Sequence, residues 1–130
     1  MQIGIMCRIY AAVDEYRHIA VHKGDPVLLW CNTTKSGGVN WTRNTTAGDF
    51  SYVSINGRIQ DRYTTRYSMD EHSLSIYNVH IGDSGCYDCY QSGEVRRFGY
   101  DLNVTGKKAI RTCIHTTLCL KKTFPPLNSL

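Results

Sequence analysis

The chain has no acidic residue after Asp101 and no long hydrophobic run. A membrane-spanning helix needs about 18 or more apolar residues in succession, so we expect no transmembrane segment in this chain. The first 104 residues hold ten Lys or Arg against all eleven acidic residues, so the net charge of +4 belongs to the C-terminal region. The basic residues of that region are Lys107, Lys108, Arg111, Lys121 and Lys122. The positive charge therefore does not predict a nucleic-acid-binding surface on the body of the protein.

The sequence also lacks the motifs that catalysis and cofactor binding need. No Ser lies in a nucleophile elbow, and no Gly-rich loop leads from a strand into a helix. Cys86 and Cys89 form a C-x-x-C, but its redox use needs cysteines that open a helix after a strand. A zinc site needs a second close pair, whereas five residues separate Cys113 from Cys119. We expect no enzyme, no cofactor and no metal site; the alternative is a small redox or zinc protein built on Cys86 and Cys89.

The stretch from Asp83 to Cys89 has the two-residue period of a β-strand. Gly85, Tyr87 and Cys89 share one face of such a strand. A cysteine and a tyrosine on one face suggest a buried disulfide beside an aromatic ring whose hydroxyl needs a partner. The matching cysteine should end an earlier apolar strand. The run 27–31, which reads VLLWC, is such a strand, and Trp41 follows ten residues after its cysteine.

These residues resemble the immunoglobulin superfamily, and specifically its variable-type (V-set) domain. The resemblance covers roughly residues 18–104 and implies an all-β, two-sheet Greek-key sandwich. It implies that Cys31 and Cys89 form a disulfide between the sheets, with Trp41 packed on it and Tyr87 in a tyrosine corner. It further implies core positions at Leu74 and Ile76, and a salt bridge between Arg62 and Asp83.

The domain organisation follows from where the strand pattern begins and ends. We expect a loosely ordered N-terminal segment over 1–17, the V-type domain over 18–105, and a disordered, basic, Cys-containing tail over 106–130. Within the domain we expect strands at about 26–32, 38–43, 50–55, 58–59, 63–68, 73–78, 85–91 and 95–104. An earlier edge strand contains Ile19 and Val21.

The asparagines indicate a secretory route. Four of the seven asparagines begin an Asn-x-Ser/Thr triplet, and these glycosylation candidates are Asn32, Asn40, Asn44 and Asn103. A disulfide also requires an oxidising compartment. Residues 1–13 make a poor signal peptide, because they have no basic start and Arg8 shortens the apolar run. We expect an extracellular protein, either secreted or the outer domain of a membrane receptor.

Four cysteines remain after the core pair: Cys7, Cys86, Cys113 and Cys119. They allow three complete pairings. Geometry favours Cys86 with a tail cysteine, or Cys113 with Cys119. The alternative is a bond between two chains through Cys86 or a tail cysteine, which would make a homodimer.

The outward face of the G-F-C-C′ sheet and the nearby loops are the expected binding surface, because variable-type domains most often bind partners there. The ligand-binding candidates are Tyr52, Asp88, Tyr90, Glu94, Arg96 and Arg97. A glycan on Asn40 would hinder flat docking on this face and favour the loops. The resemblance implies an immune-type receptor that binds a protein or cell-surface ligand. The alternatives are a homophilic adhesion module that dimerises through the same face, and a structural module with no ligand.

Overall fold

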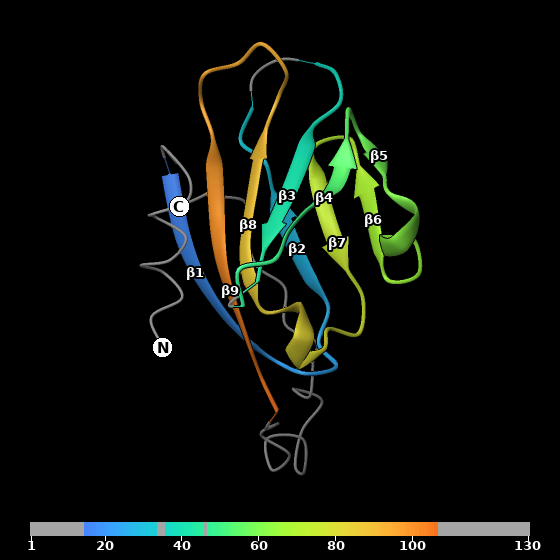
Figure 1. Ribbon diagram of the computed structural model, residues 1–130, viewed down its shortest axis with the longest axis vertical. Coiled ribbons are helices and arrows are strands. Elements are labelled where there is room, and N and C mark those ends of the chain that lie inside the picture. Colours follow the sequence, from blue (N-terminus) through green and yellow to red (C-terminus); the bar gives the residue numbers. More distant parts are fainter. Residues whose placement is uncertain (1–14, 34–35, 46, 107–130) are drawn as a thin grey trace, which may run out of the picture.

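The computed structural model describes residues 15–33, 36–45 and 47–106, which fold into two β-sheets (Figure 1). The strands are β1 (Glu15–His22), β2 (Val27–Trp30), β3 (Asn40–Asn44), β4 (Phe50–Ile55), β5 (Arg58–Ile59), β6 (Tyr67–Asp70), β7 (Ser73–Ile76), β8 (Gly85–Tyr90) and β9 (Phe98–Thr105). Two short 3-10 turns, η1 (Asp61–Tyr63) and η2 (Ile81–Asp83), connect β5 to β6 and β7 to β8.

The larger sheet has six strands in the order β1-β9-β8-β3-β4-β5, and the smaller has the order β2-β7-β6. β1 pairs with β9 in parallel, whereas the other neighbours are antiparallel. The first and last described strands therefore lie side by side at one edge of the larger sheet (Figure 1). Together the two sheets form an all-β, immunoglobulin-like sandwich.

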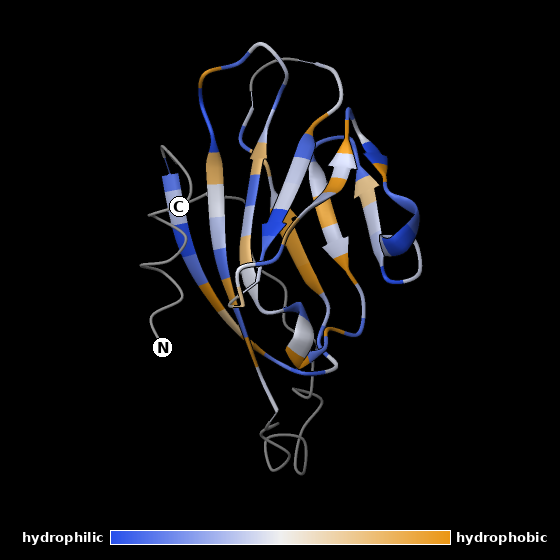
Figure 2. Ribbon diagram, in the orientation of Figure 1, coloured by the Kyte–Doolittle hydropathy of each residue, from blue (hydrophilic) through white to orange (hydrophobic). Residues whose placement is uncertain are grey.

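Alternating apolar residues place the core between the sheets. β9 directs Phe98, Tyr100 and Leu102 inward, and each of them is almost fully buried. In Figure 2 the strands carry most of the apolar residues and the turns are mostly polar; Val95 and Ile81 are exposed apolar exceptions outside the strands. Burying one large apolar side chain contributes about 1.5–3 kcal/mol, so these alternating positions drive the association of the two sheets.

The turn between β4 and β5 fits its residues. Asn56 and Gly57 both have positive φ, at 51° and 83°, which is the backbone of the Asn-Gly hairpin turn. This turn packs against Gly38, where an added Cβ would lie 2.1 Å from the carbonyl of Asn56. Only glycine fits at 38. The segment that leads into β3 therefore packs directly against the turn of the β4–β5 hairpin.

Several element boundaries differ from those expected; β9, for example, begins at Phe98 rather than at 95. β1 begins at Glu15, so residues 15–17 belong to the sheet rather than to a loose segment that ends at 17. The strand expected over 63–68 is β6, which begins only at Tyr67, because η1 occupies 61–63. The amide of Tyr63 donates to the carbonyl of Gln60 at 2.8 Å, and this closes the turn before the chain extends.

Residues 1–14 and 107–130 lie outside the described residues, so this fold tests neither the interpretation of residues 1–13 as a poor signal peptide nor the expected disordered tail. Within the part that the structure describes, no helix has both the length and the apolar character to cross a membrane.

Candidate functional site

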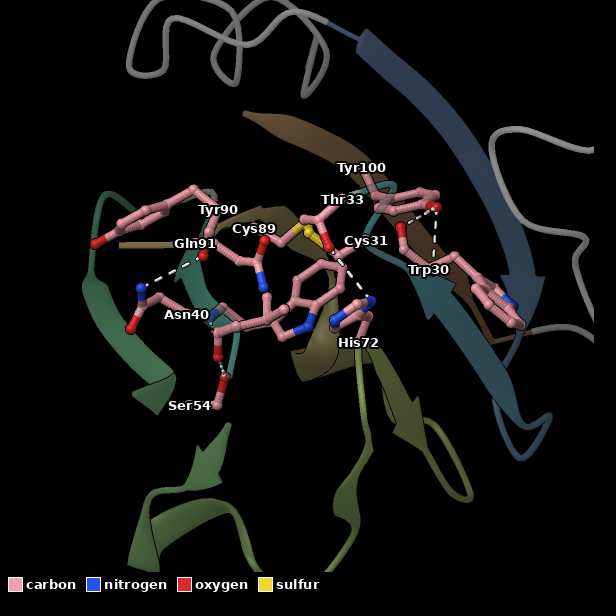
Figure 3. Close-up of a disulfide and its surroundings, with 12 residues drawn as sticks. Trp30, Cys31, Thr33, Asn40, Ser54, His72, Cys89, Tyr90, Gln91 and Tyr100 are labelled. Carbon is pink, nitrogen blue, oxygen red and sulfur yellow. Dashed lines mark hydrogen bonds between the residues drawn. A yellow bond between two sulfur atoms is a disulfide. The ribbon is translucent and has the colours of Figure 1, made fainter. Parts of the chain in front are cut away.

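The outward face of the larger sheet is supported by a disulfide in the core beneath it (Figure 3). Cys31, just after β2, and Cys89 on β8 are bonded, with their Cα atoms 5.9 Å apart. The ring of Trp41 on β3 is fully buried and lies 6.2 Å from the ring of Tyr100. The Tyr100 hydroxyl donates to the carbonyl of Trp30 at 2.8 Å, so a side chain of one sheet is bonded to the backbone of the other. The core positions Tyr87, Leu74 and Ile76 are also fully buried.

Hydrogen bonds around Asp83 hold the end of the sandwich at η2. The Tyr87 hydroxyl donates to the Asp83 carbonyl at 2.6 Å, and Tyr67 donates to the Asp83 carboxylate at 2.7 Å. Burial of Asp83 opposes its ionisation, but hydrogen bonds from Arg66, the His80 amide and Tyr67 outweigh that effect and lower its pKa. Burial also raises the pKa of Tyr67 and Tyr87 well above the usual range, so both hydroxyls stay protonated.

Asp83 forms its salt bridge with Arg66, so the prediction that it pairs with Arg62 is wrong. The Nη1 and Nη2 atoms of Arg66 donate to the two carboxylate oxygens of Asp83 at 2.6 Å and 3.0 Å. Arg62 lies in η1, where its guanidinium is stacked 5.2 Å from the ring centroid of Tyr63. Arg62 therefore contacts an aromatic ring, and the ion pair with Asp83 is made by Arg66, four residues later.

Three aromatic residues gather on the outward face. Phe50 and Tyr52 of β4 pack edge to face at 5.5 Å, and the hydroxyls of Tyr52 and Tyr90 lie 3.3 Å apart. We call Phe50, Tyr52 and Tyr90 the aromatic patch. Phe50 is 56% exposed and Tyr52 is 38% exposed. The guanidinium of Arg97 stacks on the Tyr90 ring at 4.2 Å, which extends the patch with a cation.

Asp88 lies beside the patch but does not present its carboxylate to solvent. It is only 7% exposed, although its position on β8 predicted an outward, accessible side chain. Burial raises the pKa of Asp88 to about 6, and the charge of Arg97 limits that rise. Its Oδ1 atom has no hydrogen-bond partner among the described residues. Thr42, the neighbour of Asp88 on β3, is buried as well. The part of this face below the patch therefore consists of polar side chains that are covered from solvent.

Glu94 and Arg96 lie away from the patch, so the structure divides the predicted binding residues into two groups. Both line a small cavity of about 10 Å³, with Asn32, Thr33 and Phe98. Arg96 stacks on the Phe98 ring at 5.1 Å and lies 3.7 Å from the Glu15 carboxylate. That cavity has room for about one water molecule, so this group is not a ligand pocket of its own.

The four glycosylation candidates differ in accessibility. Asn40 is 4% exposed, its Nδ2 donates to Tyr90 O and Ser92 Oγ at 3.3 Å each, and its Oδ1 accepts from the Asn56 amide at 3.0 Å. Asn40 was expected to point outward, but these contacts occupy its amide and leave no room for a glycan. Asn103 is exposed, whereas Asn32 and Asn44 are half-buried.

Cys86 lies on the outward side of β8, yet it is buried and disulfide-bonded. Because Cys31 and Cys89 bond each other, its partner is not among the described residues. The expected pairings of Cys7, Cys113 and Cys119 fall outside those residues too. In residues 15–33, 36–45 and 47–106, no three His, Cys, Asp or Glu side chains are grouped closely enough to hold a metal ion.

Sequence reasoning missed Phe50 and Arg66. The signal for Phe50 was available, because it shares the alternation of Tyr52 on one strand. The role of Arg66 depends on η1, which sequence periodicity did not reveal.

No family model matches the chain, and no curated protein matches it. The solved structures that match number 1375 chains, so the fold is a common one and does not select a function by itself. One of them is the extracellular domain of the voltage-gated sodium channel β4 subunit, reported as parallel homodimers that explain its role in cell–cell adhesion. It shares 15% sequence identity, with a TM-score of 0.58, and the match covers 76% of this chain and 92% of that one.

Proposed function

We propose that this chain is a V-type immunoglobulin domain that acts outside the cell, has no enzymatic role, and recognises a protein on a cell surface through the aromatic patch. The parallel pairing of β1 with β9 and the two added strands β4 and β5 support the V-type assignment. The predicted disulfide of Cys31 with Cys89 and the Asn-x-Ser/Thr triplets support an extracellular location. An immune-type receptor fits these features.

The patch itself is the observation that carries the proposal. Protein interfaces are enriched in Tyr, Phe and Arg at their centres, and Phe50, Tyr52, Tyr90 and Arg97 form one continuous group. Aromatic side chains offer large contact area for little loss of conformational freedom. A glycan on Asn40 would hinder docking on this face. The Asn40 side chain cannot carry that glycan while its amide donates to the carbonyl of Tyr90.

The test is the binding of a tetramerised full chain to a panel of cells, measured by flow cytometry. We expect staining of at least one cell type, sensitive to trypsin treatment of those cells because the partner is a protein. Tyr52→Ala and Tyr90→Ala should each reduce the staining about tenfold or more, as interface anchors do. Tyr77→Ala is the matched control, since Tyr77 is 55% exposed and lies just after β7 of the smaller sheet. Equal losses for Tyr77→Ala and Tyr90→Ala would contradict a role for the patch.

Homophilic adhesion is the second candidate. The sodium channel β4 domain, which is similar in fold, forms parallel homodimers in cell–cell adhesion. At 15% identity this likeness carries the fold alone, so the candidate depends on whether the patch pairs with itself. Sedimentation equilibrium of the unlabelled full chain separates the two candidates. A concentration-dependent dimer that Tyr90→Ala abolishes and Tyr77→Ala preserves would establish self-association, whereas a monomer at all concentrations would leave recognition of another protein.

A further inference from the structure

A cavity of about 270 Å³ lies between η1, the start of β6 and η2, and arginines dominate its lining. Arg43, Arg62 and Arg66 contribute three guanidinium groups, against the single carboxylate of Asp83. The lining thus carries a net charge of +2 with His80 neutral. None of the residues of the aromatic patch lines it, so it is a separate site.

Only one of the three arginines is neutralised by the carboxylate. Both carboxylate oxygens of Asp83 accept hydrogen bonds from Arg66, so this carboxylate does not neutralise the other two arginines. Arg62, on the adjacent turn, contacts the ring of Tyr63 and pairs with no carboxylate among the described residues. Arg62 is exposed and lines the cavity, so its guanidinium is accessible to an anion.

Arg43 adds a second cation without an acidic partner. Its Nη2 donates to the carbonyl of Gly82, and its Nε is buried and has no acceptor in the described part of the chain. Its guanidinium also lies 5.8 Å from the centroid of the Tyr87 ring. Arg43 is half-buried and has no carboxylate partner among the described residues, so its charge favours a negative charge nearby. No protein carboxylate other than that of Asp83 lines this cavity.

We propose that the cavity binds a tetrahedral oxyanion, the sulfate group of a sulfated saccharide. Guanidinium groups match such an anion, because their planar fork donates two parallel hydrogen bonds to two of its oxygens. The volume is just below the usual range of small-molecule sites, which suits one charged sugar unit and not a long stretch of polymer. Thr65 is exposed and lines the same cavity, so its hydroxyl offers a hydrogen-bond donor to the sugar.

Binding is measured by isothermal titration calorimetry on the full chain, with a sulfated disaccharide and with its unsulfated form. We expect saturable binding of the sulfated sugar only. Arg62→Gln should weaken it about tenfold, which is the effect of losing one charge-assisted hydrogen bond. Arg58→Gln is the matched control, because Arg58 is also an exposed arginine but does not line the cavity. Both variants keep the basic residues beyond position 106, so non-specific attraction to them cancels in the comparison.

The side-chain Nε–H resonance of Arg43 gives an independent measurement by NMR. It should shift with sulfate concentration along a single saturating curve, and the melting temperature of Arg62→Gln should stay that of the parent. Inorganic phosphate is titrated in parallel. If phosphate binds more tightly than sulfate, the cavity is still an oxyanion site, but its ligand is a phosphate ester. The proposal is overturned if the unsulfated sugar binds equally well, if Arg58→Gln weakens binding as much as Arg62→Gln, or if the Arg43 resonance does not move.

Discussion

Arg66 holds both carboxylate oxygens of Asp83, and this pair closes the end of the sandwich where β7 passes into β8. The carboxylate also accepts from Tyr67 and from the backbone amide of His80 at 2.6 Å. Four donors from three residues converge on one buried acid, because Arg66 supplies two of them. Removing the cation would leave that acid buried with only neutral donors.

We therefore expect Arg66→Ala to lower the free energy of unfolding by about 2 kcal/mol. Breaking a fully buried pair costs about 3–5 kcal/mol, and the partial exposure of Arg66 reduces that figure. Arg62→Ala, which removes only a contact with the Tyr63 ring, should change stability by about 0.5 kcal/mol or less. Urea denaturation of both variants at pH 7 is the measurement. A larger loss for Arg62→Ala would restore the pairing that the sequence first predicted.

Acid should weaken the same end of the molecule. The pKa of Asp83 is lower in the folded protein than its usual 3.8, so its ionised form contributes stability at neutral pH. That contribution is present above the unfolded pKa and is lost as the pH falls through the folded value. Asp83→Asn should therefore be less stable than the parent at pH 7, and the difference should shrink below about pH 4. A constant difference from pH 7 to pH 2 would show that the charge of Asp83 is not responsible.

Asp88 should have the opposite pH dependence. Burial raises its pKa from 3.8 to about 6, so between these values the folded protein holds a proton that the unfolded chain has released. The free energy of unfolding therefore falls as the pH rises through this interval. Asp88→Asn should be more stable than the parent by roughly 2 kcal/mol at pH 7.5, and equal to it at pH 4. The measurement is urea denaturation across that range, with the exposed Asp49→Asn as control. A destabilised Asp88→Asn at pH 7.5 would mean that the carboxylate has a strong partner.

The strand pattern explains why much of the fold could be predicted from the sequence. Alternation along β8 determines which residues face inward, and the resemblance to variable-type immunoglobulin domains implied the partner of Cys89 on the opposite sheet. Features that depend on irregular backbone could not be predicted in this way. The pairing of Arg66 depends on η1, and the burial of Asn40 depends on the Asn56 amide, which a turn sixteen residues later brings to it.

The candidate binding surface was predictable only in part for the same reason. Tyr52 and Tyr90 were placed on one face by their strand positions, and they do meet there. Glu94 and Arg96 follow β8 in a loop, where a period of two no longer indicates direction, and they turn toward Phe98 instead. Asp88 points to the expected side, but periodicity does not report how deeply a side chain is covered.

The two cysteines of β8 should differ in their effect on stability. The bond between Cys31 and Cys89 crosses the core, and in the chain-entropy model closing a loop of this length contributes roughly 4 kcal/mol. Cys86 lies on the outward side of the same strand, so its bond does not link the two sheets through the core. We expect the Cys31→Ala, Cys89→Ala double variant to melt at a much lower temperature than Cys86→Ala, as measured by calorimetry. Equal losses would contradict the central role of the core pair.

Glycan occupancy should follow the accessibility of each asparagine when the chain is produced by secretory cells. Asn103 is exposed at the outer side of β9, and we expect it to carry a glycan. Asn40 should carry none, because its amide is buried and bonded to Tyr90, Ser92 and Asn56. Intact mass spectrometry should therefore show the loss of one glycan for Asn103→Gln and no glycan loss for Asn40→Gln. The second variant should instead lose about 2 kcal/mol of stability through its broken hydrogen bonds. A glycan on Asn40 of the parent would mean that the contacts beneath Tyr90 do not form in the secreted protein, and it would move the binding surface from the aromatic patch to the loops.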